Sequence, residues 1–127
     1  MHEMEITKHI LEDSIRIAKA QGAVRIREIH LALGAFCGLV PDCIQMYMDV
    51  LSQGTMAESV KIVSRSIPLR VECLDCHQIA QIDRRHIECP NCHSLRLKRL
   101  SGKECLIERL EVDVNGDQGL SPDHGVE

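Results

Sequence analysis

Hydrophobic residues recur at helical spacing near the start of the chain and again after Pro41. The first stretch runs from about Met4 to Gln21, and Gly22 follows it as an expected helix cap. The second begins at Pro41, which suits a first helical position, and Gly54 stops it. The pattern predicts two amphipathic helices. Their apolar positions are Ile6, Ile10, Ile17 and Ala18 in the first, and Ile44, Tyr47, Met48 and Leu51 in the second.

Three further stretches alternate between apolar and polar residues, as strands do. They are Val24–Gly34, Ser59–Ile67 and Cys105–Val112. In the first of them, Ile29 and Leu31 follow one register whereas Ile26 follows the other. We therefore expect this strand to be buried in part on both faces or to carry a bulge.

The segment between the last two strands differs in character, because it holds few apolar residues and two C-x-x-C pairs. A strand on the far side of that segment indicates an insertion into a sheet that the chain later completes. The predicted fold is therefore α+β, with a small three-stranded sheet, two helices and an inserted four-cysteine zinc-ribbon module. We place the body at residues 1–68 and 104–113, the module at 69–103, and a disordered acidic tail at 114–127.

The two C-x-x-C pairs predict a metal site. Each pair can aim two sulfurs at one ion from a single tight turn, and four thiolates form the tetrahedral cage that zinc prefers. Four ligands leave no open position, so we assign this ion a role in folding and not in catalysis. The four ligands are Cys73, Cys76, Cys89 and Cys92.

Each pair is followed by a histidine, His77 or His93, so each also matches C-x-x-C-H, the attachment motif of c-type haem. The two motifs lie close together, and the surrounding sequence is poor in the bulky apolar residues that would enclose two haems. We favour zinc. The two histidines are expected on the module's surface, with ligand exchange or a pH response beside the metal as the alternative.

Composition narrows the classes of function. Phe36 and Tyr47 are the only aromatic residues, so there is no base-stacking surface for single-stranded nucleic acid. The net charge is −4, and four of the 19 acidic residues follow Val112, which leaves a neutral body. This balance suits neither nucleic acid nor an anionic membrane.

The start of the chain is acidic and is not followed by an apolar run, which argues against a secretory signal. We expect a cytoplasmic protein, in which seven cysteines serve as metal ligands or free thiols rather than disulfides. Of the three outside the pairs, Cys105 is expected to be small core filling in the last strand. Cys37 and Cys43 flank the loop before the second helix and are expected to be thiols, with a metal or redox role as the alternative.

His2 is a second candidate metal ligand because of its position. The terminal amine of Met1, the amide nitrogens that follow and the His2 imidazole can form fused chelate rings, a donor set that suits nickel(II) or copper(II). A histidine at position two does not by itself close a four-nitrogen chelate. The Glu3 carboxylate or a group from elsewhere would help to complete it.

The order of these features resembles the HypA/HybF family of hydrogenase maturation nickel chaperones. The likeness rests on Met-His-Glu at the start, the helix and strand order, the loop Gly34–Asp42, the pairs C-x-x-C and C-P-x-C, and a final strand. It covers residues 1 to about 113. It implies that the α/β body binds nickel through His2, with Met1, Glu3 and Asp42 as candidate additional ligands, and that the four cysteines hold zinc.

The resemblance further implies a non-enzymatic function. Such a protein delivers Ni(II) to the large subunit of [NiFe] hydrogenase together with a HypB-type GTPase, and some relatives serve urease. A monomer or a homodimer is compatible with the neutral body. The competing hypothesis is a zinc-ribbon adaptor or nucleic-acid-binding protein without nickel delivery, based on the seven basic and four acidic residues of 70–103.

Overall fold

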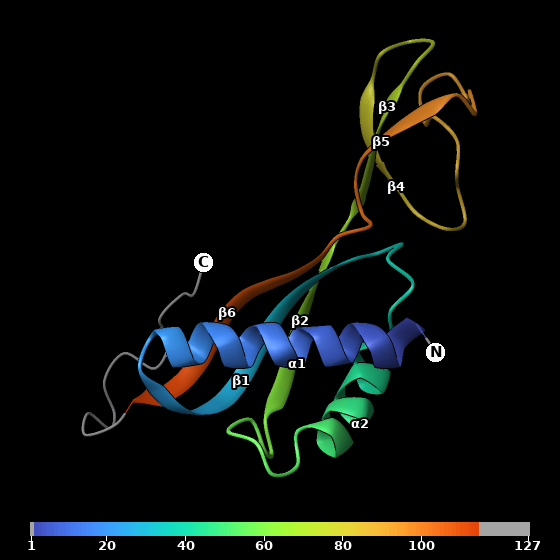
Figure 1. The fold of residues 1–127 in the computed structure, drawn as a ribbon. Helices are drawn as coiled ribbons and strands as arrows, with labels where there is room; N and C mark the ends of the chain where they lie inside the picture. Colours follow the sequence, from blue (N-terminus) through green and yellow to red (C-terminus); the bar gives the residue numbers. More distant parts are fainter. Residues whose placement is uncertain (1, 115–127) are drawn as a thin grey trace. The chain divides into compact units, whose positions relative to one another are not determined.

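The computed structural model describes residues 2–114 and contains two helices and six strands (Figure 1). The chain divides into two compact units. Of the described residues, the first unit comprises 2–31, 39–65 and 106–114, and the second comprises 32–38 and 66–105. Apart from residue 114, the acidic tail expected at 114–127 lies outside the described residues. The elements are α1 His2–Ala20, β1 Ala23–Gly34, α2 Pro41–Leu51, β2 Lys61–Ile67, β3 Leu69–Cys73, β4 Ile79–Ile82, β5 Leu97–Ser101 and β6 Cys105–Val114.

The strands form two three-stranded sheets, one in the order β2-β1-β6 and the other in the order β4-β3-β5. The first is the sheet predicted from the sequence, and the second carries the four cysteines. This confirms the predicted α+β class. None of the described helices is long and apolar enough to cross a membrane.

The helices α1 and α2 contact each other in the first unit. In Figure 1, α1 runs alongside strands β1, β2 and β6. One side of α1 is buried at helical spacing, and so are Ile44 and Met48 of α2. Gly22 ends α1 in a left-handed conformation, with φ of 77°. The buried positions of α1 are Thr7, Ile10, Leu11, Ser14 and Ala18.

Strand β1 shows the change of register that its sequence indicates. Ile26 and Ile29 are both fully buried although they are three residues apart, so the alternation shifts between them. From Leu31 to Gly34 every residue is buried, which indicates cover on both faces. Glu28 and His30 lie between the buried positions and are half-buried.

The second unit has a small core at one end of the sheet β4-β3-β5. Leu69, Val71 and Ile82 are buried together, with Phe36 and Leu97 packed against them. Strand β3 is central and pairs antiparallel with β4 and with β5. A core of this size provides little apolar burial for a unit of this length.

Strand β4 ends at Ile82 and pairs with β3, and an isolated antiparallel bridge joins Asp83 to His86 just after it. The Asp83 carboxylate accepts hydrogen bonds from the backbone N–H groups of Arg85 and His86, at 2.8 and 3.0 Å. This side-chain turn stops the strand, because it competes with ladder hydrogen bonds.

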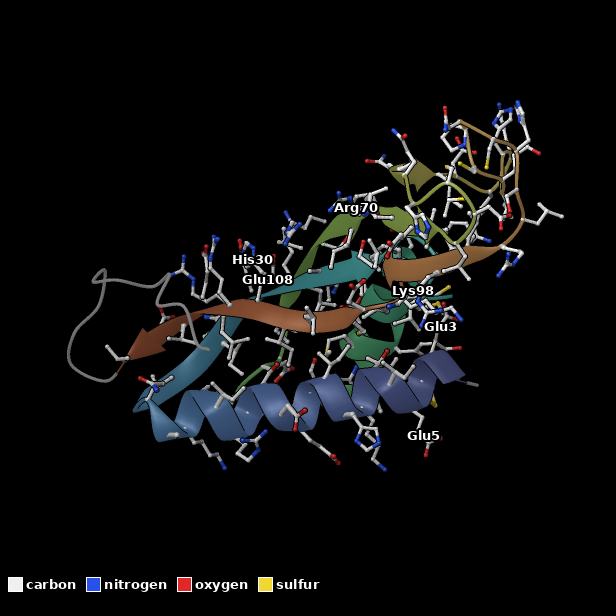
Figure 2. The ribbon with its side chains drawn as sticks, turned by 90° about the horizontal axis from the view of Figure 1, so that it is seen from above. Glu3, Glu5, His30, Arg70, Lys98 and Glu108 are labelled. Carbon is white, nitrogen blue, oxygen red and sulfur yellow. The ribbon has the colours of Figure 1, made fainter. Side chains whose placement is uncertain are left out.

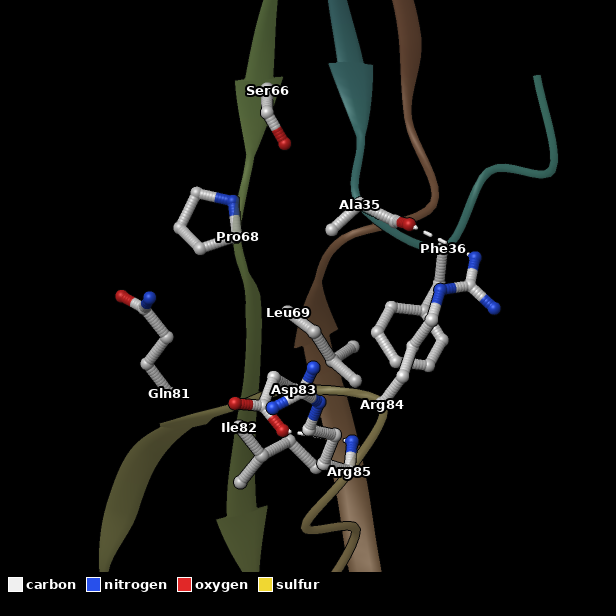
Figure 3. Close-up of a pocket in the computed structure, with 10 residues that line it drawn as sticks. All are labelled: Ala35, Phe36, Ser66, Pro68, Leu69, Gln81, Ile82, Asp83, Arg84 and Arg85. Carbon is white, nitrogen blue, oxygen red and sulfur yellow. Dashed lines mark hydrogen bonds between the residues drawn. The ribbon is translucent and has the colours of Figure 1, made fainter. Parts of the chain in front are cut away.

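Beside this turn the second unit has an open hollow of about 700 Å³ (Figure 3). The Arg84 guanidinium lies 4.6 Å from the centre of the Phe36 ring and donates a hydrogen bond to the Ala35 carbonyl. The only acidic lining residue is Asp83, whose carboxylate is already bonded to backbone. The hollow therefore has no set of groups suited to hold a metal ion.

Gly34 and Gly102 approach each other closely where β1 ends. A Cβ atom on Gly34 would lie 2.2 Å from the carbonyl carbon and oxygen of Gly102, and this contact is with backbone that cannot rotate away. We expect Gly34→Ala to lower the free energy of unfolding by about 2 kcal/mol, through overpacking. Urea unfolding of zinc-loaded protein measures the effect.

Gly22→Ala is the matched control for this substitution. Its Cβ would meet nothing within 4 Å, but φ is 77°, so only backbone strain is added, about 1 kcal/mol. Equal midpoints for the Gly34→Ala and parent proteins would show that the backbones can separate at no cost.

Candidate metal centre

The sulfur atoms of the four cysteines converge in the second unit. Their Sγ atoms all lie within 4.8 Å of one another. The Cys73 and Cys92 sulfurs are 3.6 Å apart, and so are those of Cys76 and Cys89. A disulfide would need about 2.05 Å. Sulfurs at about 2.3 Å from a tetrahedral zinc ion are separated by about 3.8 Å, so the spacing fits one ion at the centre.

Two turns of the same construction hold these sulfurs. Backbone N–H groups of Asp75 and Cys76 donate to the Cys73 sulfur, both at 3.4 Å. In the second turn Asn91 and Cys92 donate to the Cys89 sulfur at 3.4 and 3.5 Å. Because N–H groups that point at a sulfur stabilise its thiolate, each turn prepares a metal ligand.

The residue after each pair closes its turn. The backbone N–H of His77 donates to the Cys73 carbonyl at 2.9 Å, and that of His93 donates to the Cys89 carbonyl at 2.8 Å. Both histidines have positive φ, 65° and 66°, and both are exposed. The His93 ring lies 2.8 Å from the carboxylate of Glu88. The two histidines are thus on the surface, and one cluster of four sulfurs fits a single ion better than two haems.

The two turns are also joined by side chains. The Asp75 carboxylate accepts a hydrogen bond from the Ser94 hydroxyl and pairs with Arg96. These contacts lower the pKa of Asp75, with the Ser94 hydrogen bond as the main cause. The carboxylate therefore stays ionised and ties the first turn to the residues after the second.

The four thiols cannot all ionise easily without a cation. The backbone N–H of Cys76 is the main cause that lowers the pKa of Cys73, to about 6. The Ser94 N–H favours the Cys92 thiolate, but burial and the three neighbouring sulfurs outweigh it and raise the pKa of Cys92 to about 12. A divalent ion held by the four cysteines would remove this conflict, because its charge favours all four thiolates over the protonated thiols.

The described candidates for the nickel site, Glu3 and Asp42, lie in the first unit. Met1 and the side chain of His2 lie outside the described residues, although His2 begins α1. Glu3 does have a defined partner, because its Oε2 accepts a hydrogen bond at 2.9 Å from the backbone N–H of Val40. Asp42 is exposed in the first turn of α2, two residues after Val40.

The Glu3 bond joins the first turn of α1 to the start of α2. Val40 is the N-cap of α2 and has no side-chain capping hydrogen bond, so the Glu3 carboxylate serves the backbone there. Glu3 and Glu5 project from different sides of α1 (Figure 2). The Glu3 side chain of α1 therefore contacts the segment at the start of α2 that also contains Asp42.

The carboxylate contact predicts a local effect. We expect Glu3→Ala to speed hydrogen exchange of the Val40 amide and to lower stability by at most about 1 kcal/mol, because the bond is exposed. Glu5→Ala removes an acid from the same helical turn, and with it a similar interaction with the helix dipole. If NMR shows the same hydrogen-exchange rate for the Val40 amide in Glu3→Ala as in this control, the proposed hydrogen bond between Glu3 and Val40 is contradicted.

Sequence reasoning missed one group of candidate metal ligands. Among residues 2–114 a second cluster with ligand spacing consists of Glu28, His30 and Glu111, from β1 and β6. The signal was present, because Glu28 and His30 are two residues apart in a predicted strand and share one face. What the sequence does not show is that β6 places Glu111 beside them.

Comparison with known proteins agrees with this architecture. Residues 1–112 match the model of the family described as HypA, hydrogenase/urease nickel incorporation, metallochaperone. A hydrogenase maturation factor HypA from Chlorobium luteolum is 33% identical over 117 residues, which span 92% of this chain and all of the relative. One from Dehalococcoides mccartyi is 33% identical over 113 residues, 89% of this chain and 95% of the relative.

Two solved structures share the fold. The solution structure of the Ni metallochaperone HypA from Helicobacter pylori has a TM-score of 0.64 at 16% identity, over 89% of this chain and 98% of that one. A second HypA solution structure has a TM-score of 0.65 at 18% identity, over 88% and 96%. From the family match and the length of the shared sequence, the chain belongs to the HypA family of hydrogenase maturation nickel metallochaperones, a family without catalytic activity.

Proposed function

We propose that this protein binds Ni(II) through His2 and delivers it to the large subunit of [NiFe] hydrogenase. The observation that carries the proposal is the Glu3 contact, which fixes the helical turn of His2 against the loop before α2. Imidazole and backbone nitrogens suit nickel, and Glu3 and Asp42 supply carboxylates nearby. Met1 is a further candidate ligand.

Zinc has a different task in this proposal. The four cysteine sulfurs can supply all four ligands of a tetrahedral ion. They belong to the second unit, which has only a small apolar core. We assign it structural Zn(II) held by Cys73, Cys76, Cys89 and Cys92. A closed site that keeps its ion and an N-terminal site that releases one fit a carrier better than two sites of the same kind.

The family match supports partners in the nickel-insertion machinery of hydrogenase and urease. For this chain we propose a HypB-type GTPase and the hydrogenase large subunit as partners in the cytoplasm, with urease maturation as a second client. The division into a body at 1–68 and 104–113 and a module at 69–103 is part of the same proposal.

The test is complementation in a hydrogenase-producing host that lacks its own HypA. The parent chain is expected to restore nickel in the purified large subunit, and His2→Ala is expected to leave it nickel-free. His9→Ala is the matched control because it removes another histidine from α1. Restoration by His2→Ala at the parent level would refute the assignment of His2.

The alternative of a nucleic-acid-binding zinc ribbon predicts a different result. Nucleic-acid affinity would fall steeply with salt and would depend on the basic residues of the second unit. One of these, Arg96, is engaged by Asp75, which weakens the case for a free basic surface.

A further inference from the structure

The exposed part of the sheet in the first unit carries a histidine between two carboxylates. Glu28 and His30 flank the buried Ile29 on β1 and therefore point to the same face. Glu111 lies on the neighbouring strand β6, between the buried Leu110 and Val112. The strand pairing thus brings together three metal-binding side chains that are far apart in the sequence.

Their spacing is that of ligands around one ion. The His30 Nε2 atom lies 2.8 Å from Glu28 Oε1 and 3.6 Å from Glu111 Oε2. One ligand atom from each of the three residues lies within 4.8 Å of the others. Nitrogen and oxygen ligands at about 2.0–2.2 Å from a metal ion are separated by about 3–3.6 Å when adjacent. An ion among these atoms would replace the 2.8 Å hydrogen bond between His30 and Glu28.

Burial favours a defined site over mobile surface charges. The exposed fractions of the side chains are 16% for His30, 21% for Glu111 and 32% for Glu28. Such side chains lose less freedom on binding than fully exposed ones do. The remaining exposure leaves room for water ligands on the solvent side.

The surrounding charges leave the cluster an excess of negative charge. Arg109 donates to Glu111 Oε2 at 3.0 Å, and Arg65 forms a forked ion pair with Glu108, which lies near His30 in Figure 2. Arg65 and Arg109 thus pair with Glu108 and Glu111, and the Glu28 carboxylate is left with His30 as its partner. Arg109 competes with a metal for Glu111, so the site is expected to bind more weakly than one without a neighbouring cation.

We propose that Glu28, His30 and Glu111 form a second, weaker site for a divalent first-row transition ion, distinct from the N-terminal site and from the four cysteines. One imidazole and two carboxylates suit ions of this class. The choice of nickel as the natural ion rests on the proposed function, whereas the site itself rests on these three side chains. At this site the protein would store a second cargo ion on the sheet of the first unit.

The test is a calorimetric titration of Ni(II) into zinc-loaded His2→Ala protein. Because the His2→Ala protein lacks the proposed N-terminal nickel ligand, the expected result is one bound nickel ion per chain, held at the sheet site. Adding His30→Gln should abolish that equivalent. Adding His86→Gln instead should leave it unchanged, because His86 has only the single carboxylate Asp83 at 3.6 Å and is 78% exposed.

NMR of the same samples locates the ion. Paramagnetic broadening should be centred on Glu28, His30 and Glu111 in the His2→Ala protein, and thermal melts confirm that each variant is folded. No remaining equivalent in His2→Ala, or one that survives in a folded His30→Gln variant, would overturn the inference. Two equivalents in His2→Ala that fall to one with His30→Gln would support the sheet site while refuting the assignment of His2.

Discussion

Cys73→Ser is expected to release the metal ion and to unfold the residues around the four-cysteine cluster. Cys73 is 1% exposed and ends the central strand of its sheet, and its sulfur accepts two backbone N–H groups. Serine is a much poorer zinc ligand, and the remaining three thiolates lose the tetrahedral set. Structural zinc contributes on the order of 10 kcal/mol in small metal-dependent modules, more than this small core can replace.

The change is measured by zinc content per chain and by amide NMR signals of residues 69–103. Cys105→Ser is the matched control, since it removes an exposed thiol at the start of β6, outside the cluster. The control is expected to keep one zinc per chain and a parent-like spectrum. A Cys73→Ser protein that did the same would show that the ion does not hold this unit together.

His2→Ala is expected to reduce nickel affinity by at least about a hundredfold while zinc content stays at one per chain. The imidazole is the only side-chain nitrogen donor in the proposed N-terminal set, and loss of a direct ligand costs at least as much as loss of the groups that orient ligands. Zinc is unaffected because its ligands lie in the other unit.

Nickel titration of zinc-loaded protein, with metal analysis before and after, measures both effects. His9→Ala controls for the loss of one α1 histidine. Glu3→Ala is expected to have a smaller effect than His2→Ala, because its carboxylate is engaged with Val40. A parent-like nickel affinity in His2→Ala would transfer the nickel role to other side chains.

Much of this fold follows from local patterns in the sequence. The amphipathic spacing around Ile10 in α1, and around Ile44 and Met48 in α2, predicted the bounds of both helices to within a few residues. This was possible because amphipathic spacing is a local property of the sequence. The cysteine pairs predicted their cluster because two tight turns bring the sulfurs together whatever surrounds them.

Other features depend on contacts between distant residues and were not predictable. Nothing local places the Glu3 carboxylate on the Val40 amide, or Glu111 beside His30. The end of β4 depends on the Asp83 turn, whose side-chain hydrogen bonds compete with the strand ladder and are not visible in the alternation of apolar and polar residues. The assignment of nickel to His2 came from the chemistry of the terminus and from family resemblance.

We propose that nickel delivery depends on two metal sites with opposite behaviour, one that transfers its ion and one that keeps it. Protein loaded with one zinc and with nickel can be mixed with metal-free hydrogenase large subunit, separated again and analysed for both metals. We predict that nickel moves to the large subunit while one zinc per chain stays with the carrier, and that His2→Ala transfers none. Nickel that stays with the carrier, or zinc that leaves together with it, would contradict the account.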